Sequence, residues 1–232
     1  MNLKDKVVVI TGGSRGLGRS MAELFIKEGA TVVVSSKDKI LLDTTAKEIK
    51  AYAIYADVAK EKDIENLVKE TVSKFGRIDL WINNAGVFIT RDFLENFESK
   101  KVKDLLLVNT FGTFLGCKFA LKQMKIQKEK GAILNVISTS ALDGRPQASM
   151  YAASKWAVVG LTKAIQMENA DSGIKILSVY PGGMKTKLFG IKKPADFDTY
   201  MEQDYVAEKV IANLKSENPE PELIIRRPTA LK

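Results

Sequence analysis

The sequence predicts a single α/β domain built on a doubly wound parallel sheet of about seven strands, with helices on both faces. Short apolar, β-branched segments alternate with longer amphipathic segments along all 232 residues. Strict β–α alternation implies parallel strands joined by right-handed crossovers. The strand-like segments are almost continuously apolar, which is typical of strands buried on both faces. The length fits one domain, so we expect residues 1–232 to form it.

Each predicted element follows from the period of its apolar residues. The predicted strands are Val7–Thr11, Thr31–Ser35, Ala51–Ala56, Leu80–Asn83, Ala132–Ile137, Lys175–Tyr180 and Leu223–Ile225. The predicted helices have apolar residues at the spacing of one helix face: Leu17–Glu28, Lys39–Lys50, Glu61–Phe75, Lys101–Lys125, Tyr151–Asp171 and Asp204–Lys215. The segment around residues 185–200 breaks this period at Gly190 and Pro194. It is either a short substrate lid or an ordinary surface loop.

The composition excludes several classes of protein. The chain has no histidine, which excludes Ser-His-Asp catalysis and His-ligated zinc, and we expect no metal site. The lone Cys117 cannot form an intrachain disulfide, and the short charged N-terminus is unlike a signal peptide, so we expect a cytoplasmic protein. No apolar run reaches the roughly 18 residues that cross a membrane, so we expect no membrane association.

The formal net charge is +8, but lysines are interleaved with acids and form no basic stripe with stacking aromatics. This pattern argues against nucleic-acid binding. An anionic cofactor or substrate explains local positive charge better.

A glycine-rich turn, Thr11–Gly18, follows the first strand and opens the first helix. Its glycines let the chain turn tightly and leave the first helical N–H groups open to a pyrophosphate. The spacing differs from the usual G-x-G-x-x-G fingerprint of dinucleotide sites, and a purely structural tight turn is the alternative. No Gly-Lys-Ser/Thr follows, so the turn is not a P-loop.

The end of the second strand favours NADP(H) over NAD(H). NAD sites place a carboxylate there to hold the ribose 2′-hydroxyl. This chain has Ser36 and Lys37 instead, and Arg15 in the glycine turn offers a second cation for a 2′-phosphate. Asp38 is the competing ribose ligand, and it would require a strand that ends two residues later.

Tyr151 and Lys155 are four residues apart, a spacing that places both on one helix face. A neighbouring ammonium favours phenolate, so we expect the pKa of Tyr151 to fall from about 10 towards neutrality. Ser138 directly follows a predicted strand, so its hydroxyl should emerge at the carboxyl edge of the sheet, where open α/β sheets bind ligands. Ser140 is the alternative to Ser138.

These motifs, with Asn83-Asn84-Ala85-Gly86, Asn109 and Pro181-Gly182 in the same order along the chain, closely resemble the short-chain dehydrogenase/reductase superfamily. The residues within these motifs are most similar to those of its 3-oxoacyl-[acyl-carrier-protein] reductase-like branch. The resemblance implies a Rossmann-type fold and a catalytic set of Ser138, Tyr151, Lys155 and Asn109. It implies cofactor contacts from Gly12, Ser14, Arg15, Gly16, Leu17, Gly18, Ser36, Lys37, Asp57, Val58, Asn84, Ala85, Gly86, Tyr151, Lys155, Pro181, Gly182, Met184 and Thr186.

Three of these roles have structural alternatives. Asp57 also fits a strand-end or cap residue, Asn84-Ala-Gly86 also fits a turn, and Asn109 fits either a water-holding proton relay or a helix kink. The resemblance further implies a homodimer or homotetramer formed through the helices Lys101–Lys125 and Tyr151–Asp171.

The resemblance implies an NADPH-dependent reductase of a small-molecule carbonyl compound. The alternatives are an NAD(P)⁺-dependent alcohol dehydrogenase and a non-enzymatic NADP-binding regulator. An acyl-carrier-protein substrate would need a basic docking patch, for which Arg91, Lys100, Lys101 and Lys103 are the candidates; the alternative is a solvated helix face.

Overall fold

The protein is described here by a computed structural model, which covers residues 1–189, 193–194 and 196–227. Its centre is a seven-stranded parallel sheet in the order β3-β2-β1-β4-β5-β6-β7. The strands are β1 Val7–Thr11, β2 Thr31–Ser36, β3 Tyr52–Tyr55, β4 Leu80–Asn83, β5 Ala132–Val136, β6 Lys175–Pro181 and β7 Glu222–Ile225. The order reverses between β1 and β4, which is the switch point where doubly wound sheets bind dinucleotides. The predicted fold class is confirmed.

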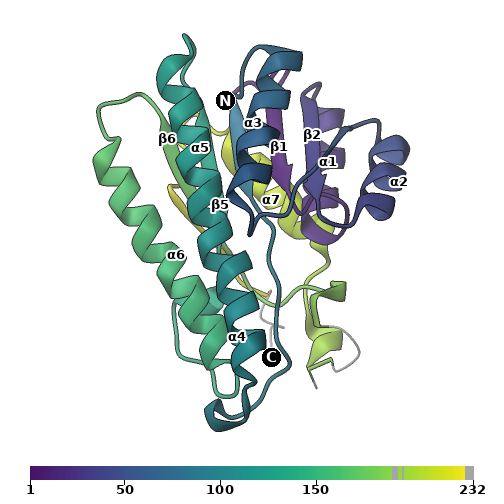
Figure 1. The fold of residues 1–232 in the computed structure, drawn as a ribbon, viewed down its shortest axis with the longest axis vertical. Helices are drawn as coiled ribbons and strands as arrows, with labels where there is room; N and C mark the ends of the chain where they lie inside the picture. Colours follow the sequence, from purple (N-terminus) through teal and green to yellow (C-terminus); the bar gives the residue numbers. More distant parts are fainter. Residues whose placement is uncertain (190–192, 195, 228–232) are drawn as a thin grey trace.

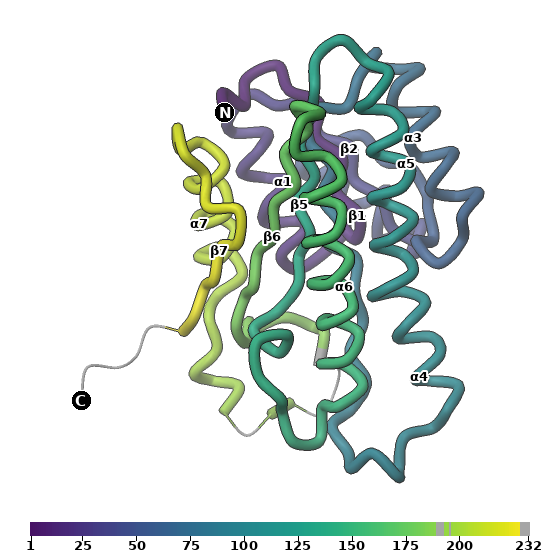
Figure 2. Tube along the Cα trace, turned by 90° about the vertical axis from the view of Figure 1, so that its left-hand side faces the viewer, coloured from purple at the N-terminus to yellow at the C-terminus, as the bar shows by residue number. Residues whose placement is uncertain are grey.

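Helices cover both faces of the sheet (Figures 1 and 2). They are α1 Gly16–Lys27, α2 Lys39–Ile49, α3 Glu61–Phe75, α4 Ser99–Leu106, α5 Gly112–Ile126, α6 Ser149–Glu168 and α7 Gln203–Lys215. Figure 2 shows the strands between α7 on one side and α3 and α5 on the other. In Figure 1, α5 and α6 lie side by side.

Alternate residues of each central strand enter different cores. In β1, Val8 and Ile10 pack with Phe25 of α1 and Val210 of α7. Val9, between them, packs in the other core with Phe119 of α5. Because both faces are buried, β1 has no polar face, which explains its continuous apolar sequence.

The edge strand β3 departs from this pattern. We predicted strands buried on both faces, but three of the four residues of β3 are exposed. The prediction is wrong here because β3 pairs only with β2 and lies at the end of the strand order. Lys74 lies over the exposed Tyr52 ring, with its ammonium 4.6 Å from the ring centroid.

The predicted helix Lys101–Lys125 is interrupted by a π-helical segment, Leu107–Phe111, between α4 and α5. By length and hydropathy, the whole stretch Ser99–Ile126 is able to cross a membrane, although 44% of its most apolar 18-residue window is buried inside the fold. Core helices of soluble proteins pass the same test, and this one covers the sheet through residues such as Leu115 and Phe119.

Candidate functional site

All the predicted site residues except Asn109 meet at the carboxyl edge of the sheet, where they line one cavity of about 1220 Å³; Asn109 is buried behind the cavity wall. The turn after β1, the ends of β2 and β4, the residues after β5 and the end of β6 all contribute to its wall. All the predicted cofactor residues line it: Gly12, Ser14, Arg15, Gly16, Leu17, Gly18, Ser36, Lys37, Asp57, Val58, Asn84, Ala85, Gly86, Tyr151, Lys155, Pro181, Gly182, Met184 and Thr186. Parallel strands explain this convergence, because their carboxyl ends share one edge.

The glycine turn is fastened to the end of β4 by Asn84. The Asn84 amide nitrogen donates to the carbonyl oxygens of Thr11, at 2.9 Å, and Gly12, at 3.1 Å. A Cβ at Gly18 would lie 2.4 Å from the Gly12 oxygen and 2.5 Å from the Asn84 amide nitrogen. Gly18 is therefore required by packing, and Gly12 by its φ of 64°. Residues 84–86 do not form the turn that was the alternative to a ribose contact; Asn84 instead holds the glycine turn and also lines the cavity, and its ribose contact stays a prediction.

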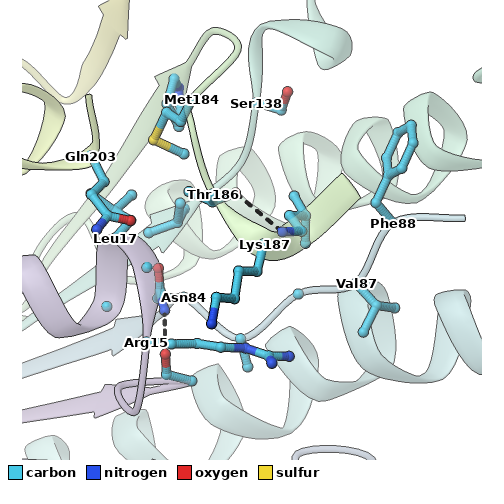
Figure 3. A pocket seen from close by; sticks show the side chains of 18 of the residues that line it. Arg15, Leu17, Asn84, Val87, Phe88, Ser138, Met184, Thr186, Lys187 and Gln203 are labelled. Atoms are coloured by element: carbon cyan, nitrogen blue, oxygen red, sulfur yellow. Dashed lines mark hydrogen bonds between the residues drawn. The ribbon is translucent and has the colours of Figure 1, made fainter. Parts of the chain in front are cut away.

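Helix α1 begins at this turn with a terminus suited to an anion. Its N-cap residue, Arg15, makes no side-chain capping bond, and its first turn contains no acidic residue. The first N–H groups and the helix dipole therefore favour a phosphate. Figure 3 shows the side chain of Lys187 extending towards Arg15 across the cavity.

The end of β2 offers cationic and hydroxyl groups but no carboxylate. Ser36 and Lys37 line the cavity. Asp38, the competing ribose ligand, instead caps α2, because its carboxylate accepts a bond from the Leu41 N–H at 3.1 Å. The strand ends at Ser36, one residue beyond the prediction and two before Asp38.

Asp57 lines the cavity and also stabilises the turn that leads into α3. Its carboxylate accepts a bond from the Ala59 N–H at 3.1 Å. Asp57 therefore has a structural role in the turn after β3, but it is not a helix cap, because the N-cap residue of α3 is Lys60. A contact with adenine stays a prediction.

Three of the four predicted catalytic residues surround the end of β5. Ser138 follows β5 in an extended conformation, and its hydroxyl oxygen accepts a bond from the Ser140 N–H at 3.1 Å. Tyr151 lies in the first turn of α6, which begins two residues earlier than predicted. Lys155, on the same face, donates to the Val136 carbonyl at 3.0 Å. Ser140 also lines the cavity, but it is Ser138 whose hydroxyl hydrogen bonds to that of Tyr151.

The side chain of Asn109 joins the loop after β4 to helix α6 through hydrogen bonds. Its side chain accepts a bond from the Val87 N–H at 2.8 Å and donates to the Val87 carbonyl at 3.0 Å. It also donates to the Ser154 hydroxyl of α6, at 3.2 Å. Because Asn109 lies in the π-helical segment, the helix irregularity expected as one of its two roles is present. Its role in a proton relay stays a prediction.

The prediction that the pKa of Tyr151 falls towards neutrality is wrong for the chain without a bound cofactor. Burial raises the pKa of Tyr151 to about 12, although its hydrogen bond with Ser138 works in the opposite direction. Burial also lowers the pKa of Lys155 to about 8. The Lys155 ammonium lies 6.0 Å from the Tyr151 ring centroid. For both Tyr151 and Lys155, the loss of hydration outweighs the attraction between phenolate and ammonium. The helix spacing alone had suggested that this attraction would dominate.

Several lining residues were not predicted from the sequence. Phe88 packs edge-on against Tyr151, with the ring centroids 5.0 Å apart. Gln203 reaches the cavity from the start of α7. Their positions depend on how loops fold back over the sheet, and no local pattern signals this.

The segment predicted as a lid contributes Lys185, Thr186, Lys187, Leu188, Lys193 and Phe197 to the cavity wall. Residues 190–192 and 195, including Gly190, lie outside the described residues. Whether the segment closes over a substrate therefore stays a prediction.

Of the suggested docking patch, Arg91 lines the cavity. Lys100 and Lys101 instead pair with Asp104 and Glu98 on exposed α4. Among the residues that the structure describes, no three His, Cys, Asp or Glu side chains gather to hold a metal ion.

Comparisons with known proteins identify the family to which this fold and site belong. The short chain dehydrogenase family model matches residues 6–196, so the chain belongs to that family. It is 34% identical to L-fucose dehydrogenase from Bos taurus over 79% of this chain and 68% of that protein. It is 37% identical to 3-oxoacyl-[acyl-carrier-protein] reductase FabG from Staphylococcus epidermidis, over 77% and 75%.

A solved structure shows the same architecture. A 3-ketoacyl-(acyl-carrier-protein) reductase from Brucella melitensis, complexed with NADH, superposes with a TM-score of 0.88 at 32% identity. The match covers 96% of this chain and 97% of that one. This chain is therefore an oxidoreductase of the short-chain dehydrogenase family, with a fold that binds a nicotinamide cofactor.

Proposed function

We propose that this protein is an NADPH-dependent reductase that converts a small-molecule ketone, aldehyde or 3-oxoacyl group to an alcohol. The observation that carries the proposal is that Ser138, Tyr151 and Lys155 share one cavity with the glycine turn. The cofactor, when bound, supplies the hydride. The protein supplies the proton and the orientation.

Several features of the cavity support a phosphorylated dinucleotide as the cofactor. The uncapped start of α1 suits the pyrophosphate, and Arg15 and Lys37 supply cations where a 2′-phosphate would lie. The one nearby carboxylate that competes for NAD, Asp38, is used as a helix cap. These contacts support NADP(H) over NAD(H).

In the proposed mechanism, Tyr151 donates its phenolic proton to the carbonyl oxygen of the substrate. Ser138 hydrogen bonds to the same oxygen and stabilises the negative charge that develops on it. The buried ammonium of Lys155 favours the phenolate that Tyr151 becomes once the proton has left. Asn109 holds the Val87 loop against α6 and so keeps the wall of the cavity in place.

The same residues also catalyse the reverse oxidation in principle. We favour reduction because the cations near the 2′-phosphate position favour NADP(H), which cells keep largely reduced. We also propose that the protein is a homodimer or homotetramer. Aromatic side chains on the outer faces of α5 and α6 support this, since Trp156 is 50% exposed and Phe114 40% exposed.

The test follows NADPH absorbance with a panel of β-ketoacyl thioesters, simple ketones, quinones and sugar ketones. We expect wild-type protein to oxidise NADPH with at least one class, and Tyr151→Phe to lose turnover because it has no proton to donate. Calorimetry should show unchanged NADPH affinity for the variant. Retained turnover by Tyr151→Phe would contradict the mechanism.

A further inference from the structure

Two arginines, Arg91 and Arg145, line the same cavity as Ser138 and Tyr151. Arg91 lies in the loop after β4, three residues beyond Phe88, whose ring packs against Tyr151. Arg145 lies in the loop between Ser138 and Tyr151. Both side chains are exposed to solvent, and within the described part of the chain neither forms a salt bridge. Two cations that form no salt bridge with any described residue thus line the cavity on the loops around Phe88 and before Tyr151.

The two loops are fastened to each other. The Asp92 N–H donates to the Gln147 carbonyl at 3.0 Å. The Ala148 N–H donates to the Arg145 carbonyl at 3.2 Å, which closes a turn with Pro146 at its second position. Gln147, at the third position, has a φ of 60°, a conformation that favours glycine and that non-glycine residues rarely adopt. The backbone carrying Arg145 is therefore held beside the backbone carrying Arg91.

The charged residues that line the cavity are nearly all cations. Among the described residues that line the cavity, the only carboxylate belongs to Asp57, which precedes α3 near the end of β3. Burial and Asp196 raise the pKa of the nearby Tyr200, and the positive charge of Arg91 partly offsets this. The cofactor phosphates account for the cations of the glycine turn and β2. They do not account for arginines on the loops that carry Phe88 and lead to Tyr151.

We propose that the carbonyl substrate carries an oxyanion group, a carboxylate or a phosphate, which Arg91 and Arg145 bind while Ser138 and Tyr151 hold its carbonyl oxygen. The inference rests on the proposed function and specifies the substrate class. A guanidinium forms two parallel hydrogen bonds with such an oxyanion, and this geometry gives specificity as well as affinity. A neutral substrate would leave both arginines without a partner.

Matched substrate pairs test this inference. Acetoacetate and its methyl ester differ in a carboxylate, and dihydroxyacetone phosphate and dihydroxyacetone differ in a phosphate. We expect the charged member of at least one pair to have a kcat/KM higher by about 10- to 100-fold, the range expected for charge-assisted hydrogen bonds. The pair with the larger ratio distinguishes carboxylate from phosphate.

Variants of the two arginines test whether they cause the preference for the charged substrate. Arg91→Gln and Arg145→Gln should each reduce the ratio, and the double variant should abolish it, with NADPH affinity unchanged. Lys128→Gln is the matched control, because it removes an exposed charge just before β5, at the opposite edge of the sheet. We expect it to leave the ratio unchanged.

Equal kcat/KM within both pairs would overturn the inference, as would a preference that survives in the double variant; both leave the proposed function intact. If no compound is reduced at all, the proposed function fails. The inference is then decided by calorimetry of each pair with the NADP⁺-loaded protein, where equal affinities overturn it.

Discussion

Lys155→Met should make the protein more stable at neutral pH, although it removes a residue that we place in the reaction. The Lys155 side chain is buried, with a 5% exposed fraction, and its one hydrogen bond recorded in the structure goes to the Val136 carbonyl. Burying an ammonium with so little compensation disfavours the folded state. Methionine matches the length of the lysine stem and carries no charge. The substitution therefore separates the cost of the charge from the packing of the stem.

The magnitude follows from the lowered pKa. The pKa of Lys155 is about 8 in the fold against an ordinary value of 10.5, a difference that corresponds to about 3 kcal/mol of destabilisation. The variant also loses the hydrogen bond to Val136, which offsets about 1 kcal/mol of the gain. We therefore expect a net gain of about 2 kcal/mol, which raises the Tm of a chain of this size by about 4–8 °C.

The pH dependence has a definite sign. Below pH 8 the ammonium is charged in both states, and the full penalty acts on the wild type. Between pH 8 and 10.5 the unfolded chain holds the proton that the folded chain has released, so wild-type stability rises with pH. The advantage of Lys155→Met should therefore disappear by about pH 10.

Urea unfolding of both proteins at pH 7 and at pH 10, without cofactor, measures this difference. Lys128→Met is the control, because an exposed lysine should change stability by no more than about 0.5 kcal/mol at either pH. A variant that is less stable than wild type at pH 7 would refute the reasoning. So would an advantage that does not shrink as the pH rises.

Three further predictions concern the cofactor turn, the cofactor choice and the assembly. Gly18→Ala should weaken NADPH binding and destabilise the fold by about 2–4 kcal/mol in urea unfolding, because its methyl group overlaps backbone. Gly160→Ala, where a methyl meets open space within α6, should instead stabilise by about 0.5–1 kcal/mol, and equal effects would contradict the packing argument. Arg15→Ala with Lys37→Asp should shift the ratio of kcat/KM from NADPH towards NADH; an unchanged ratio would show that these cations do not select the cofactor. Trp156→Glu should reduce the mass of the assembly in sedimentation experiments, and an unchanged mass would exclude this face of α6 as its interface.

Much of this molecule was predictable because local patterns fix its geometry. The alternation of apolar and amphipathic segments determined a parallel sheet, and a parallel sheet brings strand ends to one edge. Ser138 and the glycine turn were therefore placed correctly without any tertiary contact. The spacing of Tyr151 and Lys155 similarly placed both on one face of α6.

The predictions that failed depended on tertiary surroundings. The apolar sequence of β3 resembles that of a central strand, and only the strand order shows that it lies at an edge. Phe88 reaches the cavity from the loop after β4, whose path no periodicity determines. The direction of the Tyr151 pKa shift was wrong for the same reason. Spacing reveals the neighbouring Lys155, but burial acts on both groups and is set by the whole fold.

The raised pKa of Tyr151 and the lowered pKa of Lys155 determine which form each residue has before proton transfer. A general acid must hold its proton at the working pH, and a pKa of about 12 keeps Tyr151 protonated throughout the neutral range. In the proposed mechanism, Tyr151 therefore starts in the protonated form that reduction of a carbonyl needs, whereas oxidation of an alcohol would first require loss of that proton. Lys155, with a pKa of about 8, remains mostly charged at neutral pH and stabilises the phenolate only after transfer. Burial keeps the proton on Tyr151 by the same physical effect that makes Lys155 costly for stability.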